Sequence, residues 1–540
     1  MKNLLKITLL SGVIALFASC ETSELELLVS PNDVTTDNAD PNFVLNDIQL
    51  TFNTVVGGYD GSSRAIVRQI NLFDSYSGAV SNTTLNTSFS QSYQMFSNID
   101  LLQGINDVQA DNGGIPYHVG VAQIIEAYAY MLLVDYLDEV PFSEAVQPSE
   151  FPNPNLDSGA AVYAAQLELL DAAIANLNLG DATQARIPDD LYFQDFDTAN
   201  WINVANTLKL RAYLNTGNVA GFNAAAASNI IDQNDEDFQF QYSTATNPSS
   251  THPFFGSSYG SAGAGARMSN NLFDFMNVGD AQQPFPETDT PVDPRARYYF
   301  YRQTSNAPTG NDIPCEGVNI YDYCYVGNAY WGRDHADNEG LPNDGLRRTA
   351  YGIYPGGGAF DADQATPTPT VASSSESLAG AGIRPIFLAS FTHFTLAEAA
   401  LTIGANGNPR TLLETGIRRS MNKVRDFAGT ADNGAFEMTD ADINNYVNSV
   451  LTEYDAANAN GKLAVVSKEY FLAAWGNGVE PYNLYRRTGL PDLQAPVTAA
   501  GAFPRSFQYP LIEVDGNPNI QQRSVLTKVF WDTRGGDNLD

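Results

Sequence analysis

Apolar residues recur at spacings of three and four along three segments in the first half of the chain. They are Val121, Ile124, Ile125, Tyr128, Leu132 and Tyr136 in the first segment, Tyr163, Leu167, Leu170, Ile174 and Leu177 in the second, and Trp201, Ala205, Leu208 and Ala212 in the third. This spacing places the apolar side chains on one face of an α-helix. Ser158 and Thr198 precede the second and third segments and are residue types that cap helix N-termini. The pattern therefore predicts three amphipathic helices.

The same rhythm returns in the second half of the chain, over residues 391–403, 412–424, 443–454 and 463–475. Each stripe is one-sided, so each helix needs a neighbour to bury it. Helix pairs stacked as in tetratricopeptide arrays would meet this need, although no sharp repeat of about 34 residues is visible. We therefore predict a mostly α fold, a tetratricopeptide-like helix-pair scaffold with helical blocks at about 42–242 and 385–480.

The stretch between the two blocks, residues 243–384, has no long apolar period and is rich in Gly, Pro, Asn, Asp and Tyr. Examples are the glycine-rich runs 260–265 and 351–358. This composition predicts a large loop-rich insertion carried by the helical scaffold, and loops on rigid scaffolds commonly hold binding residues. Residues 481–540 are also loop-like, and we expect 42–540 to form a single domain.

The N-terminus begins with Lys2 and Lys6, continues with an apolar run over residues 7–17, and reaches Cys20 after two small residues. This order is typical of a secretory signal peptide. A cysteine directly after small residues indicates a lipoprotein signal over 1–19, with Cys20 acylated as the first mature residue. The alternative is an ordinary signal peptide with an incidental cysteine. The run is too short for a membrane span, which needs roughly 20 apolar residues.

Residues 20–41 are polar and acidic and are expected to form a tether between the lipid and the folded body. Glu21, Glu24 and Glu26 resemble the surface-export signals of Bacteroidetes lipoproteins. We therefore predict a protein of the outer membrane and cell surface that is held to the membrane by lipid only.

The net charge of −34, from 62 acidic and 28 basic residues, narrows the range of partners. A surface this acidic repels nucleic acid, because phosphate binding depends on Lys and Arg. It also disfavours docking on anionic lipid headgroups, so an acyl chain would have to provide the attachment. The hydrophobic content of 43% is typical of a globular chain.

Cys315 and Cys324 are the two cysteines that remain. In an exported chain, two cysteines nine residues apart favour a disulfide that closes a small loop. Two free buried thiols are the alternative. The neighbouring sequence lacks the ligand spacing of a zinc site.

Several segments, taken together, resemble the SusD/RagB family of outer-membrane lipoproteins. They are YMLLVDYLDEVPFSEA (130–145), WINVANTLKLR (201–211), DPR (293–295), WGRDH (331–335), YRRTGLP (485–491), FPRSFQYP (503–510) with Glu513 and Asn517, and FWD (530–532). The first departs from the family pattern at Leu137, where glycine is common. The segments follow the family's order along nearly the whole chain.

This resemblance implies four tetratricopeptide-like helix pairs and a cell-surface lipoprotein that caps a SusC-type TonB-dependent transporter. It implies capture of a nutrient, an oligosaccharide in many members and an oligopeptide in others, and its delivery to the transporter. We expect an oligosaccharide. The alternatives are the same importer role with peptides, a surface glycan hydrolase, and a purely structural surface protein. Most residues of the family segments, among them Trp201, Arg211, Arg486 and Arg505, are expected to be scaffold.

Aromatic and amide side chains are the candidates for ligand contact, because sugars lie against ring faces and bond to planar polar groups. One candidate cluster is in the insertion, beside the expected disulfide: Tyr321, Tyr323, Tyr325, Tyr330 and Trp331. A second lies in a Ser/Thr/Asn-rich segment placed before the first long helix: Tyr76, Asn82, Asn86 and Tyr93. For the first cluster, the alternative is that the rings only pack the insertion against the helices.

A short acidic segment suggests a calcium site. Its candidate ligands are Asp334, Asp337, Asn338 and Asp344, with Glu339 and Asn343 between them. Calcium takes six to eight oxygen ligands, which a glycine-containing oxygen-rich loop can supply, but the spacing does not match an EF-hand. The alternative is a solvated acidic turn. No other cofactor is indicated.

Motifs for catalysis are missing from the sequence. The four histidines form no H-E-x-x-H helix, and no G-x-S-x-G elbow occurs. The glycine-rich run 260–265 lacks the following Lys-Ser or Lys-Thr of a phosphate loop. We therefore predict a binding protein and not an enzyme.

Overall fold

The structure of the protein is a computed structural model. It describes residues 35–36, 38–179, 190–194, 197–278, 291–305, 326–338, 344–431, 436–536 and 539. The expected signal peptide, Cys20, nearly all of the tether, and the Cys315–Cys324 pair lie outside the described residues.

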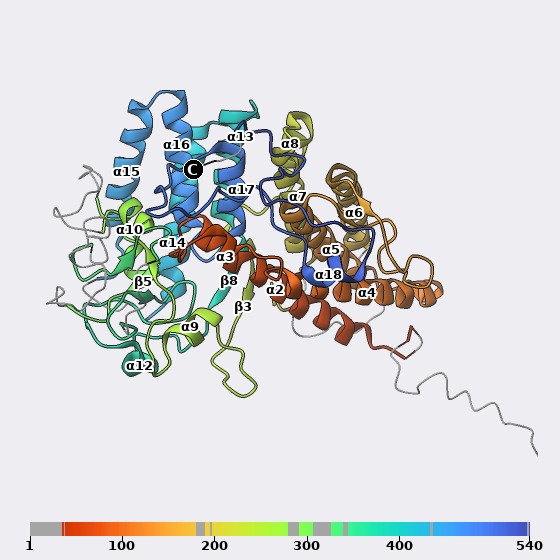
Figure 1. Ribbon diagram of the computed structural model, residues 1–540, viewed down its shortest axis with the longest axis horizontal. Coiled ribbons are helices and arrows are strands. Elements are labelled where there is room, and N and C mark those ends of the chain that lie inside the picture. The colour runs from red at the N-terminus through yellow and green to blue at the C-terminus, as the bar shows by residue number, and fades with distance from the viewer. Residues whose placement is uncertain are drawn as a thin grey trace, which may run out of the picture.

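The first helical block packs its long helices in pairs. Its elements are α2 (Pro41–Ile66), α3 (Tyr76–Ala79), α4 (Asn86–Val108), η1 (Ala110–Asn112), α5 (Pro116–Leu137), β1 (Val140–Pro141), β2 (Leu156–Asp157), α6 (Gly159–Leu179), α7 (Thr198–Asn215), α8 (Val219–Ala226), η2 (Asn234–Glu236) and β3 (Phe238–Gln241). Helix α2 packs on α4, α5 on α6, and α7 on α8. In Figure 1 this block runs from red to yellow and fills the right side of the molecule.

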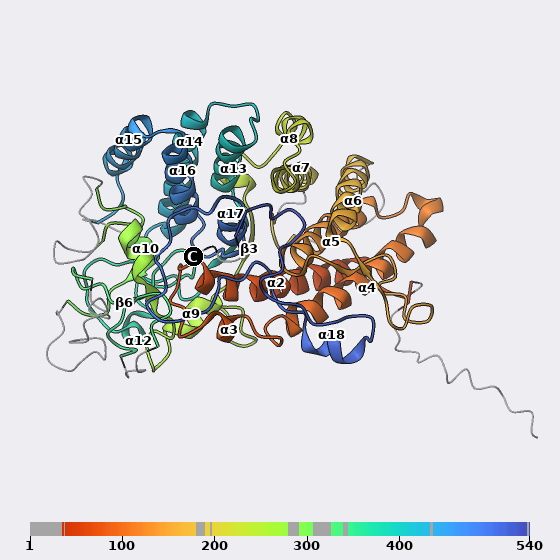
Figure 2. The ribbon, with the colours of Figure 1, turned by 45° about the horizontal axis from the view of Figure 1, so that its top comes forward.

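The second helical block packs against the first. Its elements are α13 (Ala389–Thr402), α14 (Pro409–Ala428), α15 (Asp440–Ala456), α16 (Ala459–Ala473) and α17 (Val479–Thr488), and a short α18 (Leu511–Gly516) follows in the C-terminal segment. Helix α13 packs on α14 and α16, and α15 packs on α16. The contact between α7 and α13 joins the two blocks, as Figure 2 shows. The predicted mostly helical, tetratricopeptide-like scaffold is confirmed.

The insertion between the blocks contains short elements and many loops. They are α9 (Pro253–Ser258), β4 (Met268–Ser269), α10 (Asn270–Phe275), α11 (Ala296–Tyr299), β5 (Phe300–Tyr301), β6 (Gly332–Arg333), β7 (Ala350–Tyr351), α12 (Thr368–Val371) and β8 (Ile383–Phe387). Strand β3 pairs with β8 antiparallel, β5 with β7 antiparallel, and β4 with β6 parallel. The β3–β8 pair brings the two ends of the insertion together at its base.

One cluster of buried apolar side chains extends through both helical blocks, the insertion and the C-terminal segment, from Val44 to Trp531. Helix α5 lies in it and is buried on nearly all sides. Among the described helices, α5 alone is long and apolar enough to cross a membrane, but 89% of its most apolar window is buried inside the protein. A helix that is apolar all round and enclosed by protein is typical of a core.

A buried ionic network joins α5, α7, α17 and the C-terminal segment. Asp135 on α5 accepts hydrogen bonds from Arg211 (2.6 Å), Asn483 (2.9 Å) and the indole N–H of Trp531 (2.9 Å). Arg211 also bonds to Glu480 at 2.6 Å. Buried charges are tolerated only when paired and hydrogen-bonded in this way. Arg211 therefore serves as scaffold, as expected.

The C-terminal segment is tied down by two arginines. Arg505, fully buried, forms a bidentate pair with Asp532 at 2.5 and 2.6 Å. Arg486 donates to the carbonyls of Asp135 (2.7 Å) and Arg505 (2.9 Å). Arg505 therefore bonds to a carboxylate and Arg486 to backbone carbonyls, which agrees with the scaffold role expected of both.

Two local predictions about the first block need correction. The side chain that caps α7 is Asp197, which accepts from the amide of Ala199, and Thr198 is the first helical residue. The segment with Asn86 and Tyr93 does not precede the first long helix, because both residues lie in α4 and α2 comes before it. The polar residues Asn, Ser and Gln on α4 obscure its apolar stripe, which is Phe89, Phe96, Ile99 and Leu102.

Glu126 on α5 makes the stability of the protein depend on pH. Burial, with a contribution from the charge of Asp100 on α4, raises the pKa of Glu126 from 4.5 to about 8. An acid whose pKa is raised on folding stabilises the fold fully below its unfolded value, and this contribution is lost as pH rises through its folded value. Between these pH values we expect the free energy of unfolding to fall by up to about 5 kcal/mol, since each unit by which the pKa is raised corresponds to about 1.4 kcal/mol.

Glu126→Gln is expected to remove this pH dependence and to stabilise the protein at alkaline pH, as measured by urea unfolding across the pH range. Glu168→Gln, at an exposed position of the neighbouring α6, is the control. If both variants had the same pH profile as the unmodified protein, Glu126 would not be the group responsible.

Candidate functional site

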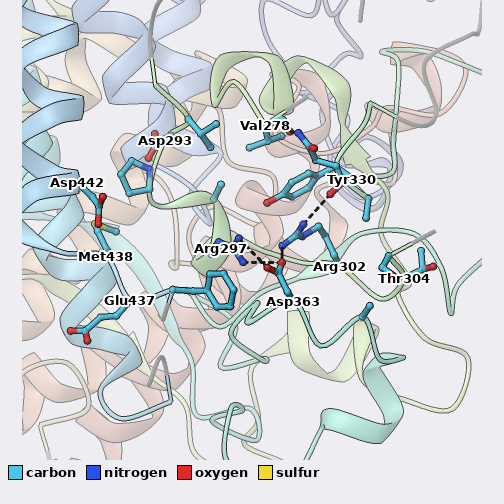
Figure 3. Close-up of a pocket in the computed structure, with 18 residues that line it drawn as sticks. Val278, Asp293, Arg297, Arg302, Thr304, Tyr330, Asp363, Glu437, Met438 and Asp442 are labelled. Atoms are coloured by element: carbon cyan, nitrogen blue, oxygen red, sulfur yellow. Dashed lines mark hydrogen bonds and ion pairs between the residues drawn. The ribbon is translucent and has the colours of Figure 1, made fainter. Parts of the chain in front are cut away.

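A cavity of about 800 Å³ opens where the insertion meets the N-terminus of α15 (Figure 3). Its walls come from four stretches of the insertion, from the segment before α15 and from the first turn of α15. The lining residues are Val278, Val292, Asp293, Pro294, Ala296, Arg297, Arg302, Thr304, Ser305, Asn328, Ala329, Tyr330, Asp363, Ala365, Phe436, Glu437, Met438 and Asp442. The volume is in the range of small-molecule and oligomer sites.

Arg297, Arg302 and Asp363 form the polar wall of the cavity, and the buried Asp361 lies behind them. Arg302 binds the buried Asp361 through Nε at 2.6 Å and Nη2 at 3.1 Å, and it also bonds to Asp363. Arg297 bonds to Asp363 at 3.0 Å and to the carbonyl of Asp361 at 2.9 Å. Figure 3 shows both guanidinium groups converging on Asp363. Bidentate pairs of this kind hold planar groups in fixed orientations.

The turn before α11 sets the direction of Arg297. Arg295, two residues earlier, is fully buried and bonds to Asp293, to Ser420 on α14 (2.9 Å) and to Glu469 on α16 (3.1 Å). This anchoring fixes the short α11 against the second helical block. Arg297 then lies on the side of α11 that lines the cavity.

Apolar side chains line the mouth and the back of the cavity. Phe436 is 36% exposed, and the guanidinium carbon of Arg297 lies 4.2 Å from its ring centroid. Tyr330 is buried at the back, with Arg302 at 5.0 Å from its ring and Phe273 at 5.4 Å. Cation–π contacts of this kind stiffen the rings. The exposed part of Phe436 remains accessible from solvent.

The charges of the polar wall balance each other closely. Burial would raise the pKa of Asp363, but the hydrogen bonds and positive charges of Arg297 and Arg302 outweigh it and lower that pKa. For Arg302, burial opposes the charged form, but the bond to Asp361 leaves its pKa above the ordinary value. Both groups stay ionised at neutral pH, so the wall presents permanent donors and acceptors.

Of the first predicted aromatic cluster, Tyr330 lines the cavity. Trp331, the next residue, is only 5% exposed, and its amide bonds to the hydroxyl of Thr349. Tyr321, Tyr323 and Tyr325 lie outside the described residues. Ligand contact by this cluster therefore stays a prediction.

The second predicted group lies apart from this cavity. Tyr76 is 2% exposed and bonds through its hydroxyl to His335 at 2.9 Å. The carbonyl of Asn82 accepts from the amide of Leu511, and the Tyr93 hydroxyl donates to the carbonyl of Pro141. These contacts hold loops together, and ligand binding by this group stays a prediction.

The predicted calcium ligands all have protein partners. Asp334 accepts from Asn270 (3.0 Å) and Gln494 (2.7 Å), Asp337 pairs with Arg333 (2.9 Å), Asn338 donates to Asp74 (2.9 Å), and Asp344 pairs with Arg267 (3.3 Å) and Arg348 (3.4 Å). Among the residues that the structure describes, no group of three or more His, Cys, Asp or Glu side chains is placed to hold a metal ion. Calcium binding rests on the sequence pattern alone and stays a prediction.

The sequence reading missed the residues that form most of the cavity. Arg297, Arg302, Asp363 and Phe436 are separated by up to 139 positions, and no short motif links them. The one available signal was the D-P-R turn at 293–295, which was assigned to the family pattern and not to a site.

The arrangement combines a partly exposed aromatic ring with fixed carboxylate, guanidinium and amide groups. Ring faces match the C–H faces of sugars, and fixed planar polar groups match their hydroxyls. The cavity therefore has the chemistry to hold a polyhydroxylated ligand by reversible contacts.

Comparisons with known proteins agree on one family. The model of the family SusD-like_2, described as starch-binding associating with outer membrane, matches residues 41–316 and 343–510. The comparison with curated proteins gave no match.

Solved structures with the same fold cover nearly the whole chain. A SusD homolog from Bacteroides uniformis is 18% identical with a TM-score of 0.63, covering 91% of this chain and 99% of its own. A SusD/RagB family protein from Bacteroides thetaiotaomicron is 18% identical with a TM-score of 0.63, covering 92% and 100%. A chitin-binding SusD homolog from Flavobacterium johnsoniae is 19% identical with a TM-score of 0.61, covering 92% and 100%. At these identities the likeness concerns the fold.

Proposed function

The chain belongs to the SusD-like family, described as starch-binding and associating with the outer membrane, and on this premise we propose that it captures an oligosaccharide at the cell surface and delivers it to a SusC-type TonB-dependent transporter. The protein acts by reversible binding, and the chemistry of its ligand is that of a glycan. The cavity beside α15 is the site of capture.

The observation that carries this proposal is the composition of the cavity wall. Phe436 offers a partly exposed ring, while Asp363, Arg297 and Arg302 are held in place by one another. A ligand that binds there meets groups that are already ordered, so little conformational entropy is lost on binding. The chitin-binding SusD homolog of the same fold supports a glycan as the ligand class.

Attachment and delivery rest on the sequence. Cys20 carries the acyl chain in this proposal, and the acidic residues that follow it direct the protein to the cell surface. Recovery of the chain without an acyl group would contradict the anchor. A purification that never recovers a TonB-dependent barrel with the chain would contradict delivery.

Phe436→Ala tests the capture site. We expect it to weaken binding of the oligosaccharide that the unmodified protein prefers by about tenfold, because the ring face that a sugar would contact is removed. Isothermal titration calorimetry with malto- and chito-oligosaccharides is the measurement. Phe43→Ala, at a 74% exposed position on α2, is the matched control and should leave affinity unchanged.

Other outcomes of the same screen distinguish the rival functions. Binding of oligopeptides in place of any glycan would assign the importer a peptide ligand. Release of shorter sugars from a labelled oligosaccharide would identify a hydrolase. Loss of glycan affinity in Phe43→Ala, with none in Phe436→Ala, would move the site away from the cavity.

A further inference from the structure

A second hollow, of about 650 Å³, lies between α14 and the segment that contains η2. It is lined by Gln233, Asn234, Asp235, Arg419, Asn422, Lys423, Arg425, Asp426 and Phe427. Three of these side chains are amides, and Phe427 is half-buried, with its ring edge against Tyr354 at a centroid distance of 5.3 Å. The hollow therefore repeats the combination of an aromatic ring with planar polar groups.

Two of its three cations are already neutralised by the protein. Lys423 pairs with the buried Asp237 at 2.8 Å, and Arg425 pairs with Asp440 at 2.7 Å. The Arg419 guanidinium has no ion-pair partner among the described residues, and its Nε is buried without a hydrogen-bond acceptor. Its two terminal Nη groups are not among the buried polar atoms and donate no hydrogen bond to the described residues, so they are available to a ligand.

The rim also carries two acids. Asp235 and Asp426 are exposed, and neither forms an ion pair with any residue in the described ranges. The charges left unpaired around the hollow are thus one positive and two negative. A ligand with its own negative charges would be repelled, whereas sugar hydroxyls can both donate to these carboxylates and accept from Arg419. The chemistry favours an uncharged glycan.

The hollow is separated from the first cavity by one layer of side chains. Arg425, in its wall, donates to Asp440 and to the carbonyl of Met438, and Met438 lines the first cavity. Arg425 also donates to Asn422 at 3.0 Å. Asn422 lines both the hollow and a smaller pocket of about 250 Å³ that lies between α14 and the first turn of α15.

We propose that this hollow, together with the smaller pocket, is a second set of sugar-binding positions, so that a long uncharged oligosaccharide extends from the first cavity around the start of α15 onto α14. The proposal rests on the proposed function, since it extends the same ligand beyond the cavity where it is first held. Short oligosaccharides occupy the cavity alone. Long chains contact both places and bind more tightly.

The test compares a trisaccharide with an octasaccharide of the malto- and chito-series by isothermal titration calorimetry. The unmodified protein should bind the octasaccharide more tightly. Asn422→Ala and Phe427→Ala should each weaken octasaccharide binding by about three- to tenfold, the effect of losing one hydrogen bond or one ring contact, and should leave trisaccharide binding unchanged. Asn178→Ala, exposed on α6, is the control.

The outcomes separate this proposal from the one it rests on. If the unmodified protein bound neither series, the proposed function would fail. If glycans bound but Asn422→Ala kept the full octasaccharide affinity, the α14 positions would be refuted while the first cavity stood. Asn422→Ala keeps the test valid if Phe427→Ala loses its packing against Tyr354 and fails to fold. Octagalacturonate, which carries a carboxylate on each sugar, should bind more weakly than either neutral octasaccharide, and tighter binding would overturn the assignment of an uncharged chain.

Discussion

Replacing Arg211 with Met should lower the free energy of unfolding by about 3 to 5 kcal/mol, because it leaves two buried carboxylates without their cation. The side chain of Arg211 is 2% exposed, and those of its partners Asp135 and Glu480 are 0% and 2% exposed. Methionine fills similar space but supplies no charge. Denaturation in urea, followed by fluorescence, gives the measurement.

Arg410→Met is the matched control for this prediction. Arg410 also forms a bidentate ion pair with one carboxylate, that of Asp455. This pair lies on the surface, and its side chains are 43% and 51% exposed. Exposed pairs of this kind contribute at most about 1 kcal/mol. Equal effects of the two substitutions would mean that burial of the α5–α7–α17 network does not determine its contribution.

Trp531→Ala is expected to cost about 3 to 5 kcal/mol, the range for deleting a buried large aromatic side chain. Trp531 is 4% exposed and donates its indole N–H to Asp135, and the guanidinium of Arg486 lies 4.6 Å from its ring. Its removal opens a cavity and leaves one bond of Asp135 unmade. The same urea experiment applies.

Trp531→Phe separates packing from hydrogen bonding. It keeps much of the apolar volume and removes the indole donor, so its cost should be smaller, about 1.5 to 3 kcal/mol, the range for a bond to a charged group. Because Arg211 and Trp531 bond to the same carboxylate, the costs of Arg211→Met and Trp531→Ala should not add. Strict additivity would indicate that the two residues stabilise the fold independently.

The long helices of the second block were predictable because each has a one-sided stripe. The predicted ranges 391–403, 412–424, 443–454 and 463–475 lie within or close to α13, α14, α15 and α16. Helix α2 has a similar stripe, from Leu45 through Ile48 and Phe52 to Tyr59, but a Gly-Gly pair and polar residues within it obscure the pattern. In α4 the apolar residues stand among Asn, Ser and Gln, so the helical spacing of the apolar positions is hard to recognise from the sequence.

The cavity could not be predicted in the same way, because its residues meet only through tertiary packing. Arg297 lines it because Arg295 is anchored to Ser420 and Glu469, which lie on α14 and α16. Phe436 reaches it from the segment before α15. Tyr330 was singled out for its aromatic neighbours in sequence, whereas in the fold its ring contacts Arg302 and Phe273. A reading of local motifs therefore identifies the insertion but not the site.

The bonds that Asp135 receives come from residues as far as 396 positions along the chain. Until the segment that contains Trp531 has joined the fold, α5 therefore carries a carboxylate whose bond from Trp531 has not been made. A fragment that ends before Trp531 would keep the buried carboxylate of Asp135 without this hydrogen bond. It would therefore unfold locally more often and be cleaved more readily by proteases. Docking of the C-terminal segment and stability of the core are thus coupled, and fragments that lack Trp531 should be degraded faster than the chain that contains it.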